Sequence, residues 1–198
     1  MPVTKIVPVV CPGCNTPMHT KDKDTVFLCD RCGTMQARDG VVAIVEYEAG
    51  EFRRQMDGEK VYLPFWKLGV NFNVRHSRVE GGSVSRFVGF LKGDSPSGSI
   101  DMMLPAFETD PVRYKEIAKK LTLDPPNYAR ANMDRGIKRM PCTITIDMTD
   151  DMADFLFITI EAEKPGVLQS LDYDLKVVSR KLVYLPYYKK GESLEPGY

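Results

Sequence analysis

Four cysteines near the start of the chain have the type and spacing of metal ligands. Cys11 and Cys14 enclose a Pro-Gly pair, Cys29 and Cys32 enclose an Asp-Arg pair, and fourteen residues separate the two pairs. A Cys-x-x-Cys turn presents two thiolates to one ion, and two such turns complete a tetrahedral set. Four thiolates leave no open position for a substrate. The pattern therefore predicts one structural metal ion per chain, bound by all four thiolates.

Zn²⁺ is the ion that this ligand set favours, and two alternatives rank below it. A rubredoxin-like iron site would need a longer spacing between the two pairs. A redox-active Cys-x-x-Cys is disfavoured because two paired motifs fit one ion better. His19 lies between the pairs and could replace a cysteine, but we expect an exposed loop residue. The fifth cysteine, Cys142, has no paired histidine and reads as a small buried residue.

The elements that must position these cysteines are short β-strands. Residues 3–10 read as an extended segment, residues 25–29 as a strand that delivers the second turn, and residues 40–48 as a further strand. Strand, turn, strand, turn and strand over roughly residues 8–45 resembles the zinc-ribbon family. The resemblance implies zinc and a ribbon fold. It implies no single function, because zinc ribbons serve transcription, replication, ribosomal and enzyme-accessory roles alike.

The whole chain is predicted to be α+β, with an N-terminal zinc ribbon followed by a mainly antiparallel, β-rich domain with one or two helices. We place the ribbon at 1–48, a polar linker at 49–59 and the β-rich domain at 60–198. Asp110 and Pro111 open the clearest helix, as an N-cap and a first-turn proline.

Later segments of the chain are less clear-cut. Alternation predicts a strand at 141–147. The apolar run within 152–163 is compatible with helix or strand. The tail 189–198 is expected to be frayed.

Three segments of the second domain share one form: an apolar run, then Leu-Pro, then aromatic residues and a charge. They are residues 60–67, 101–108 and 182–189. Because proline cannot donate to a sheet ladder, we expect each of the three prolines at a strand edge or a bulge. These Leu-Pro corners also resemble uncharacterised bacterial zinc-ribbon proteins in which a ribbon precedes a Leu-Pro-Phe-Trp-like segment, and that resemblance implies no activity.

The aromatic side chains of the corners have two interpretations. They form equivalent core corners of one β-rich domain, or they gather into an aromatic groove for a partner. The candidate partner-binding residues are Phe65, Trp66, Phe107, Tyr187 and Tyr188.

Charge and motif content rank the function classes. Lys and Arg number 27, as do Asp and Glu, and a neutral chain is a weak candidate for a dedicated nucleic-acid binder. The only histidines, His19 and His76, stand in no catalytic motif, so no enzyme is predicted. No segment has the composition to span a bilayer or to act as a signal peptide, and paired cysteines suit a reducing, cytoplasmic compartment.

The favoured function is a non-catalytic protein-interaction or assembly factor, acting on a protein partner or in a homo-oligomer. The first alternative is a nucleic-acid-binding accessory factor that uses the basic stretches 53–92 and 113–139. The second is a ligand-binding or enzyme-accessory subunit with a pocket behind the aromatic corners.

Overall fold

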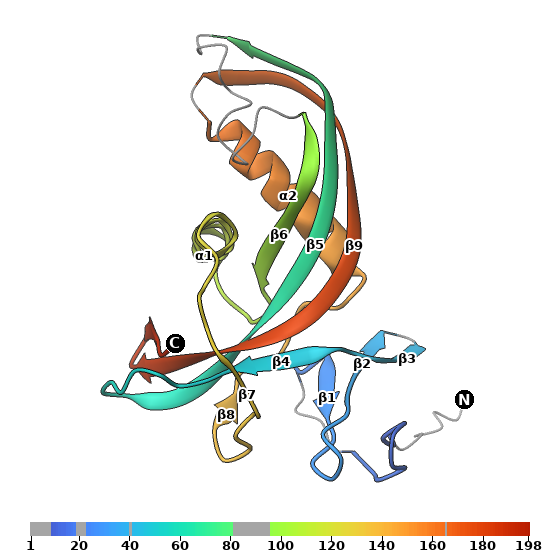
Figure 1. Ribbon diagram of the computed structural model, residues 1–198, viewed down its shortest axis with the longest axis vertical. Coiled ribbons are helices and arrows are strands. Elements are labelled where there is room, and N and C mark those ends of the chain that lie inside the picture. Colours follow the sequence, from blue (N-terminus) through green and yellow to red (C-terminus); the bar gives the residue numbers. More distant parts are fainter. Residues whose placement is uncertain (1–8, 19–22, 40, 81–95, 165) are drawn as a thin grey trace, which may run out of the picture.

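The computed structural model describes residues 9–18, 23–39, 41–80, 96–164 and 166–198. It confirms the α+β class: a small cysteine-rich region precedes a β-rich region with two helices, and most strand pairs are antiparallel (Figure 1). The elements are β1 (Val26–Leu28), β2 (Met35–Asp39), β3 (Val41–Ile44), β4 (Tyr47–Gly50), β5 (Glu59–Glu80), β6 (Ser97–Pro105), α1 (Pro111–Leu123), β7 (Arg130–Ala131), β8 (Lys138–Arg139), α2 (Met148–Ala162), β9 (Val167–Lys190) and β10 (Ser193–Pro196).

The antiparallel pair of β5 and β9 forms the centre of the large sheet. The two strands stay paired from Glu59 opposite Lys189 to Glu80 opposite Val167, with three register shifts along the way. Each shift adds local twist and bend, and Figure 1 shows the pair as one long, curved ribbon. The sheet order is β6-β5-β9-β4-β7, while β10 pairs with β9 and β8 pairs with β5.

The three Leu-Pro prolines lie where a neighbouring strand has ended. Pro105 is the last residue of β6, but Pro64 and Pro186 lie inside the two central strands, which corrects the expectation of an edge or a bulge. Their carbonyls accept hydrogen bonds from Ala106 and Gly197, each just past the end of an adjoining strand. In a β-strand, the N–H and C=O groups of one residue point to the same side. The N–H that Pro64 and Pro186 lack would therefore point toward the end of the adjoining strand.

The two helices cover the curved sheet. α1 begins as the sequence predicts: Asp110 caps it by accepting a hydrogen bond from the Arg113 N–H at 2.9 Å, and Pro111 opens its first turn. The ambiguous run 152–163 falls in α2, which packs on β9. The strand expected at 141–147 is absent from this described segment, because its backbone and side chains bond to scattered partners such as Ala106.

Both faces of the sheet are buried where β5 runs from Val61 to Leu68 and β9 from Leu182 to Tyr188. Phe65 and Trp66 are neighbours in β5, so their side chains point to opposite faces. The Trp66 face packs against α2 and forms the larger core, and the Phe65 face forms a second, smaller core. α1 contributes Tyr114 and Ala118 to the first core and Leu121 to the second.

The cysteine-rich region packs against the larger core. Its three strands form a separate sheet in the order β1-β2-β3, and Val26, Met35 and Ala37 join the Trp66 core. The chain then enters the large sheet at β4, which pairs with β9 in parallel. The segment 49–59, predicted as a linker, therefore begins inside β4, and the division into domains remains a prediction. Neither helix in the described part of the chain has the length and apolar character needed to cross a membrane.

Candidate metal centre and aromatic groove

The four paired cysteines converge on one point. All four Sγ atoms lie within 4.8 Å of one another, with Cys11 3.4 Å from Cys32 and Cys14 3.6 Å from Cys29. Ligand sulfurs at about 2.3 Å from a tetrahedral ion lie roughly 3.8 Å apart, so the cluster matches the size of such a site. The cluster could therefore hold one metal ion, with every ligand position filled by sulfur.

The two cysteine turns are copies of each other. In each, the N–H of the residue after the second cysteine donates to the carbonyl of the first cysteine at 2.8 Å, and that residue has positive φ: 57° at Asn15 and 76° at Gly33. In each, the first cysteine also donates its N–H to a threonine carbonyl, Thr16 or Thr34. The sequence carries a signal for this repeat beyond the cysteine spacing, in the form Cys-x-x-Cys-Asn/Gly-Thr.

The threonines favour the charged form of the adjacent sulfur. The Thr34 hydroxyl lies 3.2 Å from Cys32 Sγ, and hydrogen bonds from its hydroxyl and N–H lower the pKa of Cys32 to about 6. Thr16 stands in the same relation to Cys14 and lowers the pKa of that thiol. Because the thiolate is the ligand form, these hydrogen bonds prepare both sulfurs for a metal ion.

The site leaves no room for a side chain at Gly13, whose backbone lies close to Cys11 and Thr34. The Gly13 N–H lies 3.3 Å from Cys11 Sγ, and a Cβ at this position would meet Thr34 Oγ1 at 2.8 Å. Cys11 and Cys29 are buried, whereas Cys32 is exposed. Cys142 lies apart from the cluster in the larger core, and His19 falls outside the described residues.

All five aromatic candidates are buried, but the structure divides them. Phe65, Phe107 and Tyr187 come together on one face of the sheet, with ring centroids 5.6 Å apart for Phe65–Phe107 and 6.3 Å for Phe65–Tyr187. Trp66 points to the opposite face, where its Nε1 donates to the carbonyl of residue 144 at 2.9 Å. Tyr188 also lies apart, with its hydroxyl donating to the backbone at residue 54.

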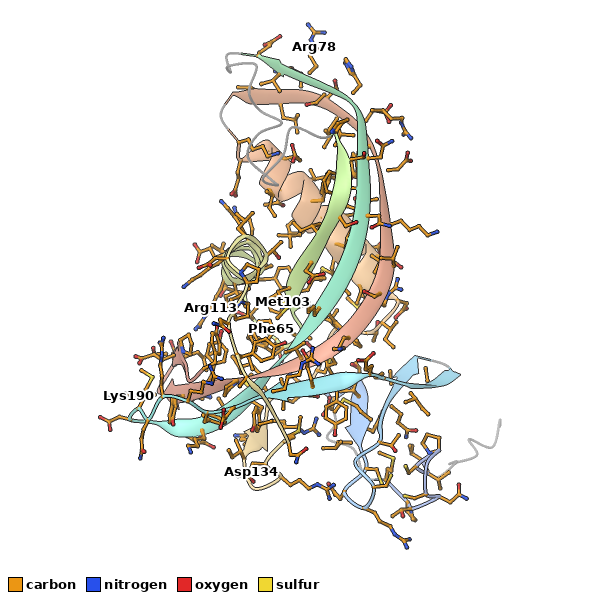
Figure 2. The ribbon with its side chains drawn as sticks, in the orientation of Figure 1. Phe65, Arg78, Met103, Arg113, Asp134 and Lys190 are labelled. Atoms are coloured by element: carbon orange, nitrogen blue, oxygen red, sulfur yellow. The ribbon has the colours of Figure 1, made fainter. Side chains whose placement is uncertain are left out.

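The three converging rings form the floor of a surface groove of about 270 Å³. One wall is α1, with Ile117 and Leu121, and the other is the C-terminal segment, with Leu194 and Tyr198. Figure 2 shows Phe65 and Arg113 close together beside α1, and both line the groove. The mouth of the groove carries Arg113, Glu116 and Lys120 from α1.

The C-terminal wall corrects the expectation of a frayed tail. β10 pairs with β9 from Ser193 opposite Lys190 to Pro196 opposite Tyr187, and the Tyr198 ring packs edge-on against Tyr187 at 5.9 Å. Burial raises the pKa of Tyr187, so this phenol stays neutral on the apolar floor. The return is a tight hairpin: the turn at Gly191, with φ 61°, and Glu192 brings β10 back onto the end of β9.

A half-buried carboxylate lies where β4 meets β9. Glu48 accepts a hydrogen bond from the Tyr128 hydroxyl and pairs with Arg130 at 2.8 Å and Lys181 at 3.5 Å. Burial alone would raise the pKa of Glu48, but these partners lower it below its usual value. The group is charged at neutral pH and links three segments of the sheet.

Eight of the fourteen described lysines and arginines in the two basic stretches are paired within the chain. In residues 53–92, four described cations pair with carboxylates, and in 113–139 four more do so. The first four are Arg53, Lys67, Arg75 and Arg78, and the second four are Lys115, Lys119, Arg130 and Arg139.

Comparisons of the chain with protein-family models, with curated proteins and with solved structures give no match. The site must therefore be interpreted from its own geometry.

Proposed function

We propose that this chain is a non-catalytic protein-interaction or assembly factor, with one structural Zn²⁺ held by Cys11, Cys14, Cys29 and Cys32. The zinc supports the fold of the cysteine-rich region, and the aromatic groove binds a segment of a partner protein. Four sulfur ligands and two matching turns support the structural assignment, since a catalytic zinc keeps one position open. The thiols suit a reducing compartment such as the cytoplasm.

The observation that carries the interaction function is the groove itself. It is open at the surface, its floor is made of aromatic rings, and two packed walls hold those rings in place. Protein interfaces use such pockets to bury one large apolar side chain of the partner. Arg113 and Lys120 at its mouth have no ion pair within the described residues, and Glu116 is the only carboxylate side chain among the residues that line the groove. The partner segment that fits is an apolar side chain next to an acidic residue.

The nucleic-acid alternative has weaker support. A phosphate-binding face needs several cations free to replace counterions. Eight cations of the two basic stretches are already paired with carboxylates, and the chain has no net charge. A ligand-binding or enzyme-accessory role ranks below both, because the groove presents few convergent polar groups.

A photo-crosslinking experiment tests the groove. A benzophenone amino acid replaces Ile117, on the groove wall, or Val112, which is exposed on α1 outside the groove lining. Expressed in its native cells, the 117 variant should crosslink to a protein at a segment that contains apolar and acidic residues. Arg113→Glu in the same background should reduce that product at least fivefold.

The comparison between crosslinks from positions 117 and 112 tests whether the partner lies in the groove. Equal products from positions 117 and 112 would refute the groove assignment. Products that disappear with nuclease treatment, rather than with protease, would replace it with the nucleic-acid alternative.

A further inference from the structure

A second apolar surface runs along the outer face of α2. Three large apolar side chains are exposed there: Met148 at 40%, Phe155 at 49% and Ile158 at 41%. With Asp151 and Ala162, which are also exposed, they occupy one face at alternating steps of three and four residues. We call these five residues the α2 seam.

The α2 seam is separate from the face that holds the helix on the sheet. The buried side chains of α2 include Ala153, Leu156, Phe157 and Ile160, which pack into the Trp66 core. Alternating steps of three and four give a mean period of 3.5 residues, the spacing by which one helix packs against another. The seam spans the fifteen residues of α2, a length of about 22 Å at 1.5 Å per residue.

Acidic side chains in and beside the α2 seam favour a basic partner. Asp147, Asp151 and Asp154 have no cation paired with them within the described residues, and the sequence of α2 contains no lysine or arginine. Asp150 is already neutralised by Arg180, with both of its oxygens within 2.7 Å of the guanidinium. A second copy of α2 would bring two acidic helices together, which like-charge repulsion disfavours.

We propose that the α2 seam docks a basic amphipathic helix of another protein, with aliphatic residues at three-four spacing flanked by lysine or arginine. The seam and the aromatic groove lie on opposite faces of β5, since α2 packs on the Trp66 face and the groove floor on the Phe65 face. The surface is therefore additional to the groove and does not depend on it.

Designed peptides provide the test. The probe is a labelled 21-residue helix with leucine at the seam-facing positions and lysine beside them. Two control peptides keep the length: one has glutamate in place of lysine, and one has the leucine order scrambled. Anisotropy with the full chain should show binding of the lysine probe at least tenfold tighter than of either control.

Variants then locate the binding. Phe155→Ala and Ile158→Ala change exposed positions and should each weaken the lysine probe at least fivefold. Asp151→Asn should weaken it threefold and reduce the salt dependence. Val112→Ala, at an exposed apolar residue of α1, is the matched control and should change the affinity less than twofold.

Three results would overturn the proposal. The first is an affinity unchanged by both Phe155→Ala and Ile158→Ala in proteins with wild-type circular dichroism. The second is equal binding of the glutamate peptide. The third is a dimer in light scattering that the same two substitutions dissociate, which would make a second copy of this chain the occupant.

Discussion

Removal of the metal should unfold the two cysteine turns and leave the large sheet intact. The small core around the turns consists of Cys11, Met18, Phe27 and Cys29. Two of these four are cysteines of the proposed zinc site, so Met18 and Phe27 are the packed apolar side chains that remain without an ion. Their burial contributes about 3–6 kcal/mol together, at roughly 1.5–3 kcal/mol each.

Conformational entropy opposes this small contribution. The turns and their flanks order roughly 16 residues, at a cost of about 1 kcal/mol or more per residue. The apolar side chains alone leave a deficit on the order of 10 kcal/mol, which is the size of the apparent zinc-binding free energy in small zinc modules, about 10–16 kcal/mol. The metal should therefore decide whether the turns fold.

The perturbation is Cys11→Ser, with Cys142→Ser as the matched control because that buried thiol lies outside the cluster. Elemental analysis should give close to one zinc per chain in the wild type and the control, and none in Cys11→Ser. Hydrogen exchange should lose at least 100-fold protection at the bonded N–H groups of Cys29 and Gly33.

The large sheet provides the internal reference. Trp66, the single tryptophan, should keep the emission of a buried indole in the zinc-free protein. Protected cysteine turns in the zinc-free variant would refute the argument. So would an exposed Trp66, because the metal would then support the whole fold rather than the turns.

Three further substitutions test the sheet. Trp66→Phe should cost about 2–4 kcal/mol in urea unfolding, because it leaves the Ile144 carbonyl without its donor and reduces a filled core. Gly50→Ala should cost about 1–3 kcal/mol, since its Cβ would lie 2.7 Å from the Pro186 ring; a loss below 0.5 kcal/mol would show that the ring moves freely. Glu48 has a lowered folded-state pKa, so its stabilisation is present above its unfolded pKa and is lost as pH falls through the folded value. Glu48→Gln should therefore be less stable than wild type at pH 7, and the two curves should converge as the pH falls through the folded-state pKa of Glu48; parallel curves would contradict this.

Control substitutions make the Gly50 and Glu48 results specific. Gly136→Ala places a Cβ 3.2 Å from the exposed Asp134 carboxylate and should change stability by less than about 0.5 kcal/mol. Glu51→Gln removes an exposed carboxylate near Glu48 in sequence and should leave the pH dependence as in wild type.

The features that could be predicted from the sequence are those with local causes. The Cys-x-x-Cys spacing identified the four clustered thiols, and Asp110-Pro111 identified the start of α1, because ligand turns and helix caps are set by a few adjacent residues. The run 152–163 was ambiguous for a physical reason. α2 has one apolar face on the sheet and a second exposed to solvent, and their sum obscures the helical period.

The features that could not be predicted depend on distant partners. Whether Pro64 and Pro186 are tolerated in central strands depends on where other strands end, and that is set by the whole topology. The groove needs β9 to pair with β5, a strand far away in the sequence. The five aromatic candidates all come from the Leu-Pro corners, but the folded sheet separates them, with Phe65 and Trp66 in the cores on opposite faces.

This opposition of faces leads to a last prediction, that the two proposed partners bind independently. The groove wall and α2 both contribute to the Trp66 core, and Glu163, just past α2, forms ion pairs with Lys115 at 3.1 Å and with Lys119 of α1. Exposed pairs of this kind contribute at most about 1 kcal/mol, so they should transmit little coupling. Arg113→Glu, which impairs the groove, should change the affinity of the lysine peptide for α2 less than twofold. A larger change that Glu163→Gln abolishes would show instead that α1 and α2 move as one unit and that the two surfaces are coupled.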